Sequence, residues 1–113
     1  MKVKELIPLP QGKVHFKLAH FKFVPKEAGC YILANFDNDV LYIGLSENLF
    51  DRFQEHLDNP EKTNPTENGK AYWFYYLRYD SKNLERLERS WMNQYENIHG
   101  ERPILNKISS PIS

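Results

Sequence analysis

The chain has 113 residues, which is enough for one compact domain. Hydrophobic residues make up 41% of it and aromatic residues 14%, a composition that excludes a disordered chain and can build a packed core. Its apolar runs are too short to span a membrane, its N-terminus has no signal-peptide pattern, and the single cysteine, Cys30, excludes an internal disulfide and a cysteine-based zinc site. These features predict a cytoplasmic protein that does not enter membranes.

The charge is balanced overall but uneven along the chain. The formal net charge is zero, yet residues 1–28 contain six Lys and only two Glu. Domains that bind nucleic acid tend to be basic because they neutralise phosphates. The first segment either supplies a local positive field or is a solvated, lysine-rich strand, and the composition alone favours the second interpretation.

The first half of the chain predicts a strand followed by a β-hairpin. Residues 1–12 contain two prolines and a glycine and predict an extended arm or loop. The alternation of Val14, Phe16 and Leu18 with polar neighbours predicts a half-buried strand. Two runs rich in β-formers then flank a short Asp/Asn turn, which predicts a hairpin over residues 30–45.

The second half predicts two helices with a strand between them. In chain order we expect a helix over 46–57, a loop over 58–70, a strand covered on both faces over 71–79 and a helix from about 80 to 98. Ser46 or Asn48 is the expected cap of the first helix, and Gly100 follows the second. The element order predicts an α/β (α+β) sandwich, in which a small, mostly antiparallel sheet of three to four strands is flanked by helices.

One carboxylate falls on the apolar side of the second helix. At about 100° per residue, Glu88 lies inside the stripe formed by Leu84, Leu87, Trp91, Tyr95 and Ile98. A carboxylate that faces a core is unfavourable unless a partner or a metal compensates for it. Glu88 is therefore either such a partnered acid or a residue at the edge of the stripe that reaches solvent, and the helix pattern alone favours the second.

Two polar side chains flank the apolar arc of the first helix. Arg52 and His56 are four residues apart and share a face beside Phe53. An arginine there can hold a phosphate, and a histidine can move a proton near neutral pH. Taken alone, a surface ion pair of Arg52 with Glu55 and a histidine satisfied at the core edge are the simpler interpretation.

The predicted hairpin carries two tyrosines, Tyr31 and Tyr42. Tyrosines in strands are usually packing residues. Because side chains alternate between faces, an even connection puts both phenols on one face of the sheet. An odd connection separates them unless a bulge intervenes.

The order of these residues resembles the GIY-YIG nuclease family. The matching segments are Gly29-Cys30-Tyr31, Tyr42-Ile43-Gly44, Asn48-Leu49 with Arg52 and His56, residues 84–92 with Glu88, and Pro103-Ile104-Leu105-Asn106. The chain is also similar to the N-terminal domain of the excision-repair incision subunit. The resemblance implies an N-terminal arm and extra strand over 1–24, a nuclease domain over 25–108 and a loose tail over 109–113.

The resemblance implies a metal-dependent endonuclease that hydrolyses DNA phosphodiester bonds at a single metal ion. Glu88 would be the one protein ligand of Mg²⁺ or Mn²⁺, Arg52 would hold the phosphate, and Tyr31 would activate the attacking water. His56 would take the phenol proton, and Tyr42 would position water and phosphate. The supporting residues would be Gly29, Gly44 and Asn106, the last tying the C-terminal segment to the site, and the nucleic-acid-binding residues would be Arg52, Lys13, Lys17, Lys26 and Lys70.

Two positions depart from the family pattern. Cys30 replaces an isoleucine at a position expected to face away from Tyr31, and Leu45 stands where many relatives have a lysine. Leu45 and the zero net charge keep open an alternative: a catalytically weak or inactive module that binds nucleic acid or protein. The expected partner is DNA, branched or damaged, and no DNA-reading module is recognisable. Sequence specificity would therefore be low or supplied by a protein partner.

Overall fold

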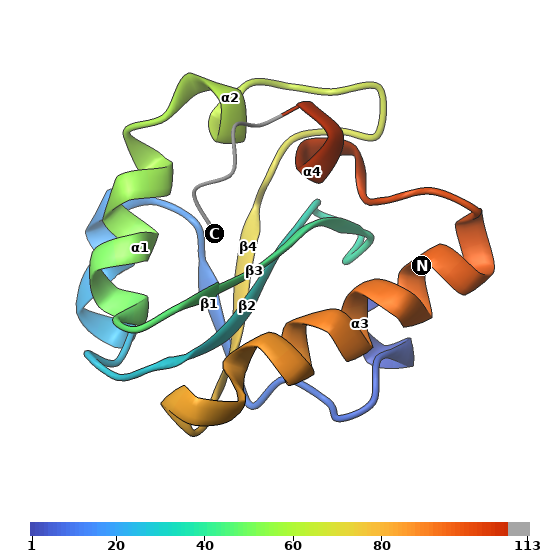
Figure 1. The fold of residues 1–113 in the computed structure, drawn as a ribbon. Helices are drawn as coiled ribbons and strands as arrows, with labels where there is room; N and C mark the ends of the chain where they lie inside the picture. The colour runs from blue at the N-terminus through green and yellow to red at the C-terminus, as the bar shows by residue number, and fades with distance from the viewer. Residues whose placement is uncertain (109–113) are drawn as a thin grey trace.

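The computed structural model describes residues 1–108; residues 109–113, for which a loose tail is expected, lie outside the described part. A four-stranded antiparallel sheet in the order β1-β4-β2-β3 forms the middle of the molecule, and helices lie against both of its faces (Figure 1). This confirms the predicted α+β sandwich. No helix within residues 1–108 combines the length and the apolar character needed to cross a bilayer.

The hairpin register decides where the two tyrosines point. The strands are β1 Gly12–His15, β2 Gly29–Ala34, β3 Val40–Ser46 and β4 Trp73–Arg78. Tyr31 pairs with Gly44 and Leu33 pairs with Tyr42, but the register shifts between Leu33 and Ala34. The connection is therefore odd, and a bulge restores the alternation. As a result Tyr31 and Tyr42 share one face of the sheet.

The helices begin and end at residues suited to those places. They are α1 Leu49–Leu57, α2 Pro60–Thr63, α3 Leu84–His99 and α4 Ile104–Ile108, with 3₁₀ helices η1 Val3–Glu5, η2 Leu18–Phe23 and η3 Ser81–Asn83. Asn48 caps α1, because its side chain accepts a hydrogen bond of 3.1 Å from the Asp51 amide. Gly100 ends α3 with a φ of 74°, a left-handed conformation that glycine adopts readily.

The sheet separates two apolar cores. The core under α3 contains Cys30, Ile32 and Trp91, whereas the core on the opposite face, on which α1 and α4 lie, contains Tyr31 and Phe53. Cys30 thus faces away from Tyr31, as predicted. Its thiol donates to the Leu84 carbonyl oxygen at 3.4 Å. Burial raises the pKa of this thiol to about 12, so it is an inert packing residue.

The N-terminal residues differ from the expected arm. Val3 and Leu6 are buried in the core under α3, and the Lys2 ammonium forms an ion pair of 3.1 Å with Asp39 at the hairpin turn. The predicted strand through Leu18 is wrong at its end. The Lys17 amide bonds back to the His15 carbonyl oxygen at 2.8 Å, which turns the chain into η2 and leaves Leu18 67% exposed.

Two further differences concern the second half of the chain. The predicted loop over 58–70 contains the short helix α2. Ile98, placed on the apolar stripe of α3, is 57% exposed because the helix runs past the core there. Strand β4 is less covered than expected: Phe74 and Leu77 are buried, while the residues between and before them are half-buried. Its neighbour β1 has only four residues and cannot shield all of it.

Candidate active site

A buried hydrogen bond joins the first tyrosine to the histidine of α1. The Tyr31 hydroxyl and His56 Nε2 lie 2.5 Å apart, and both side chains are fully buried. Strand β2 supplies the tyrosine, and α1 presents the histidine because Leu49 and Phe53 anchor that helix on the sheet. The direct contact that a proton relay from the phenol to the imidazole would need is thus present.

Gly44 makes room for this contact. A Cβ atom added at Gly44 would come within 2.6 Å of the Tyr31 hydroxyl, so any larger residue would push the phenol away. Tyr42 lies on the same side, with its ring centroid 6.0 Å from that of Tyr31. The two tyrosines and the glycine therefore form one continuous surface on β2 and β3.

Arg52 borders this surface. Its Nη1 donates to the Leu45 carbonyl oxygen at 3.2 Å, and its Nε lies 3.4 Å from a Glu55 carboxylate oxygen. The ion pair with Glu55 expected of a surface arginine is thus present. It does not remove Arg52 from the site, because the Arg52 side chain is only 17% exposed and its guanidinium lies close enough to Tyr31 to act on the pKa of the phenol.

Burial sets the protonation states of the pair. Burial raises the pKa of Tyr31 well above its ordinary value, Tyr42 adds to this, and Arg52 opposes it. Burial, helped by the positive charges of Lys62 and Arg52, lowers the pKa of His56 to about 3. At neutral pH both groups are therefore uncharged. When the phenol donates this hydrogen bond to Nε2, the neutral imidazole carries its own proton on Nδ1, an atom without a hydrogen-bond partner among the described residues.

Asn106 holds the closing segment against the site. Its side-chain oxygen accepts from the Ile43 amide and its side-chain nitrogen donates to the Ile43 carbonyl oxygen, both at 2.9 Å. This paired contact replaces a missing strand neighbour on β3, which lies at the edge of the sheet. The expected connection of the C-terminal segment to the site is present in this form.

Glu88 lies on the other side of the sheet from the tyrosines. It is half-buried on α3, near enough to Cys30 to influence the pKa of that thiol. Burial raises the pKa of Glu88, with Arg102 and Arg89 lowering it and Glu85 raising it. Helix α3 packs mainly against β3, which is an edge strand of the sheet. The structure thus brings Tyr31, Tyr42, Arg52 and His56 together and places Glu88 separately, beneath β2 and β3.

The surroundings of Glu88 fit a metal with few protein ligands. Within residues 1–108 its carboxylate forms no hydrogen bond and no ion pair, and no group of three or more His, Cys, Asp or Glu side chains could hold a metal ion. A half-buried carboxylate without a partner is unfavourable, and a divalent cation would compensate for it. Mg²⁺ is commonly bound by one or two carboxylates, with water and substrate oxygens completing its shell.

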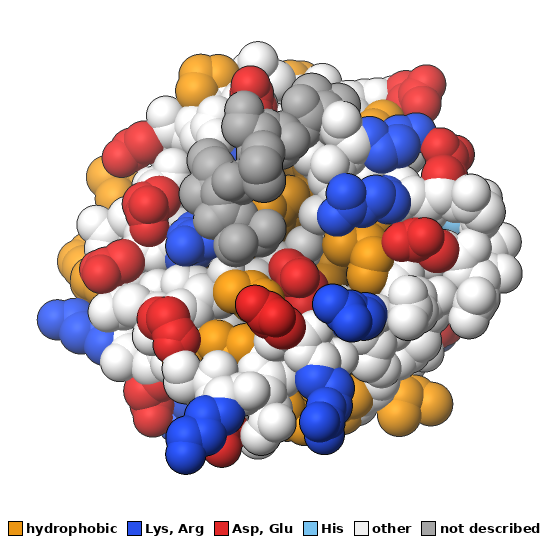
Figure 2. Space-filling model, viewed as in Figure 1, with side chains coloured by type: hydrophobic (Ala, Val, Ile, Leu, Met, Phe, Trp, Pro, Cys, Tyr) orange, Lys and Arg blue, Asp and Glu red, His pale blue; other side chains and the backbone are white. Residues whose placement is uncertain are grey.

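The predicted DNA-binding lysines do not gather around the tyrosines. Lys13 Nζ lies 4.1 Å from the Trp73 ring, and Lys26 Nζ lies 4.9 Å from the Phe50 ring on α1, while Lys17 and Lys70 are exposed. Figure 2 shows basic and acidic side chains interspersed on one face of the molecule. A role of these lysines in binding nucleic acid stays a prediction.

One buried cation near the tyrosines, Lys62, was not predicted from the sequence. Lys62 on α2 is 0% exposed, and its Nζ lies 4.7 Å from the centre of the Tyr42 ring. It was missed because residues 58–70 were predicted to be a loop. The signal for a helix was present: Asn59 followed by Pro60 is a cap followed by the residue favoured at the first helical position, and the Asn59 side chain does accept from the Glu61 amide.

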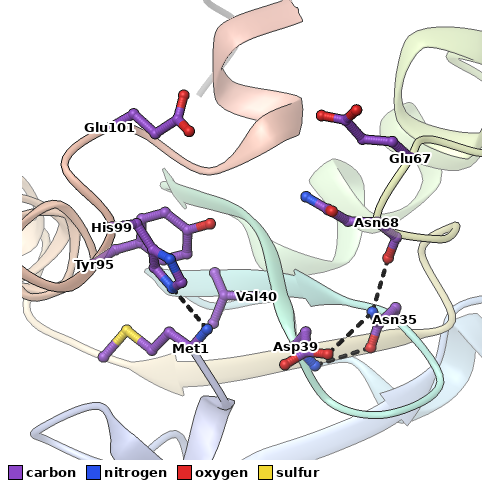
Figure 3. Close-up of a pocket in the computed structure, with 9 residues that line it drawn as sticks. All are labelled: Met1, Asn35, Asp39, Val40, Glu67, Asn68, Tyr95, His99 and Glu101. Atoms are coloured by element: carbon purple, nitrogen blue, oxygen red, sulfur yellow. Dashed lines mark hydrogen bonds between the residues drawn. The ribbon is translucent and has the colours of Figure 1, made fainter.

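A cavity of about 390 Å³ lies elsewhere, between the tip of the β2–β3 hairpin and the C-terminal end of α3 (Figure 3). It is lined by Met1, Asn35, Asp39, Val40, Glu67, Asn68, Tyr95, His99 and Glu101. The N-terminal amine lies 2.8 Å from His99 Nε2 at its edge. None of the predicted site residues lines this cavity, so its shape has no bearing on the tyrosine cluster.

Comparison with known proteins agrees with the geometry. Residues 27–102 match the GIY-YIG catalytic domain. The chain is 30% identical over 77 residues to UvrABC system protein C of Mycoplasma genitalium, a match that covers 66% of this chain and 13% of that protein. It is 38% identical over 42 residues to UvrABC system protein C of Prochlorococcus marinus subsp. pastoris, covering 37% of this chain and 6% of that protein.

These relatives are much longer than the chain, so the likeness concerns one domain of each. The matched segment contains the tyrosines, Arg52, His56 and Glu88, together with strands β2, β3 and β4, whereas β1 precedes it. The chain belongs to the GIY-YIG family and carries that family's catalytic domain, an endonuclease module, on residues 27–102.

Proposed function

We propose that this endonuclease hydrolyses DNA phosphodiester bonds with one divalent metal ion, Mg²⁺ or Mn²⁺, bound through Glu88. The observation that carries the proposal is the buried hydrogen bond between Tyr31 and His56 with Arg52 beside it. A phenol that can pass its proton to an imidazole at the moment it takes one from water can act as a general base. Without such an acceptor, a buried tyrosine is far too weak a base at neutral pH.

The protonation states support this relay. His56 is neutral at pH 7, so in the tautomer with its proton on Nδ1 its Nε2 can receive the Tyr31 proton. Burial, together with the nearby positive charges of Lys62 and Arg52, lowers the pKa of His56 and makes it a weak base before substrate arrives. A phosphate bound at these two cations would offset their charge and raise the basicity of the imidazole. Proton transfer would therefore be coupled to substrate binding.

The remaining residues position the substrate. Arg52, held through Leu45, would bind a phosphate oxygen and balance the charge that develops on it. Tyr42 would orient the water and the phosphate from the same face as Tyr31. When bound, the metal would supply Lewis-acid stabilisation of the leaving oxygen. Glu88 would hold it from α3, beside the edge strand β3, so the proposal requires the scissile phosphate to bind at this edge, within reach of both Glu88 and Arg52.

The substrate we propose is DNA, including branched or damaged DNA. The dispersed lysines and the zero net charge support weak general affinity for duplex DNA. The matched proteins are named as components of a system, and the chain spans at most 13% of their length. We therefore propose that a protein partner supplies specificity.

The alternative is a catalytically weak or inactive module that binds nucleic acid or protein, suggested by Leu45 at a position where many relatives have a lysine. The side chain of Leu45 pairs with Cys30 and packs against the core under α3, away from the phenols. A lysine there would point toward the Glu88 side, so its loss leaves the Tyr31–His56–Arg52 group unchanged. A DNA-cleavage assay distinguishes the active nuclease from the inactive module.

The test uses supercoiled plasmid and branched DNA, with Mg²⁺, Mn²⁺ or a chelator. The wild-type protein, Glu88→Gln and Arg52→Ala are compared after circular dichroism confirms that all three are folded. We expect nicking that requires metal and is lost in both variants. Equal cutting by the wild type and Glu88→Gln would refute the metal assignment. Salt-sensitive DNA binding without any cutting would identify the inactive module.

A further inference from the structure

The buried ammonium of Lys62 forms no ion pair within residues 1–108, although the charge of Glu61 acts on it. The side chain is 0% exposed, and within residues 1–108 its Nζ has no hydrogen-bond partner. The ammonium lies over the face of the Tyr42 ring, 4.7 Å from its centre. A cation–π contact offsets only part of the cost of removing an ammonium from water. The position is thus costly for the folded protein and needs a reason other than stability.

The charge of Lys62 acts on the same group of side chains as that of Arg52. Both lower the pKa of His56, and Arg52 in turn lowers the pKa of Lys62, on which burial has the largest effect and Glu61 the opposite one. Two cations at such mutual proximity repel each other. An anion between them would convert this repulsion into attraction. The helix α2 that carries Lys62 packs against α1, which carries Arg52.

We propose that Lys62 is a second phosphate-binding residue of the active site, which together with Arg52 grips the phosphate of the DNA strand beside Tyr42. This inference rests on the proposed function, whose substrate supplies the phosphate. Lysine binds phosphate as a point charge and arginine binds it through its planar fork, so the pair would fix both the position and the orientation of the group.

The burial of the site implies that substrate entry requires movement. Tyr31, His56 and Lys62 are all fully buried, so a phosphate reaches them only when a covering segment shifts. Helix α2 has four residues and lies between two loops. The unpaired ammonium of Lys62 destabilises the closed arrangement, and pairing with a phosphate stabilises the bound one. Lys62 thereby favours opening of α2 before binding and retention of the phosphate after it.

The test compares the wild type with Lys62→Met, Lys62→Arg and Lys82→Met. Methionine keeps the length of the stem without the charge, arginine keeps the charge, and Lys82 is an exposed lysine that serves as the matched control. We measure single-turnover cleavage of plasmid DNA, and thermal unfolding with inorganic phosphate against chloride of equal ionic strength. Amide hydrogen exchange reports the opening of residues 58–64.

We expect Lys62→Met to cut about 10- to 100-fold more slowly, the range of a lost hydrogen bond to a charged group, and Lys62→Arg to recover most of the rate. Without phosphate, Lys62→Met should unfold at a higher temperature than the wild type and exchange more slowly over residues 58–64. Phosphate should raise the unfolding temperature of the wild type more than that of Lys62→Met. Lys82→Met should match the wild type in every measurement.

Other outcomes separate this inference from the proposed function. If the wild type cuts and Lys62→Met cuts equally fast, Lys62 does not bind the phosphate and the nuclease assignment stands. If Lys62→Met unfolds at a lower temperature and responds to phosphate like the wild type, the ammonium has a structural role and the inference is overturned. If the wild type cuts no DNA, the proposed function fails. The phosphate response then still decides whether Lys62 forms an anion site.

Discussion

The Tyr31→Phe variant distinguishes the structural role of the Tyr31 hydroxyl from its proposed catalytic role. The change removes one oxygen atom from a fully buried side chain and leaves the ring in place against Phe74, whose centroid is 5.1 Å away. It breaks the 2.5 Å hydrogen bond and leaves His56 Nε2 buried without a donor. Such a loss destabilises a protein by about 1–3 kcal/mol, a fraction of the total stability of roughly 5–15 kcal/mol. The variant should therefore fold.

The loss of activity should be much larger than the loss of stability. Removal of a general base typically lowers the rate by about 10²–10⁴-fold. The assays are urea unfolding and single-turnover cleavage of plasmid DNA at a temperature where both proteins are folded. Tyr75→Phe is the matched control, because the Tyr75 hydroxyl also forms a 2.5 Å hydrogen bond, to the Asn38 side chain, outside the tyrosine cluster.

The control variant should lose comparable stability and keep its activity. Two results would refute the reasoning. If Tyr31→Phe cuts within tenfold of the wild type, Tyr31 is not the base. If Tyr75→Phe and Tyr31→Phe lose activity in proportion to their stability, the effect of Tyr31 is structural.

Three further predictions follow from the same cluster. The pKa of His56 is about 3 in the folded protein and about 6.5 in the unfolded chain, so between these pH values only the unfolded state takes up this proton. The free energy of unfolding is therefore fully present above pH 6.5 and falls as the pH is lowered, by up to about 1.4 kcal/mol per pH unit. Urea unfolding between pH 7 and pH 4 should show a shallower decline in His56→Gln, and parallel curves would contradict the burial of a neutral imidazole. Gly44→Ala should displace the Tyr31 phenol, cost about 1–3 kcal/mol through overpacking and abolish cutting, which unfolding and nicking assays check; normal activity would mean that the phenol is not held in place by Gly44. Asn106→Ala should lose about 1–3 kcal/mol because the amide and carbonyl of Ile43 lose their partner, whereas an unchanged unfolding midpoint would show that water replaces the contact.

Much of the fold follows from local patterns in the sequence. The helices over 49–57 and 84–99 were predicted within a few residues because apolar side chains recur at helical spacing and because Asn48 and Gly100 mark their ends. The hairpin was predicted from two β-rich runs around a turn. Helix α2 was missed, since four residues are too few to show a period. The burial of Val3 and Leu6 was missed because it depends on contacts with α3, far along the chain.

The candidate site also has features that the sequence predicts and features that it does not. The types of its residues and their order along the chain were readable from the motifs, which is why Tyr31, Tyr42, Arg52, His56 and Glu88 could be named. Their mutual placement was not readable. The register shift between Leu33 and Ala34, which puts both phenols on one face, depends on strand pairing and leaves no period in the sequence. The position of Lys62 over the Tyr42 ring depends on how α2 packs against α1.

The sequence by itself determined the chemistry available to this protein: a phenol, an imidazole, a guanidinium and one carboxylate on the apolar side of a helix. Local spacing carries this information because side chains three or four apart share a helix face, and side chains two apart share a strand face. Tertiary structure alone decided which groups became neutral, which cation was buried and which face each group occupies. Burial and charge proximity set those properties, and both depend on residues far apart in the chain.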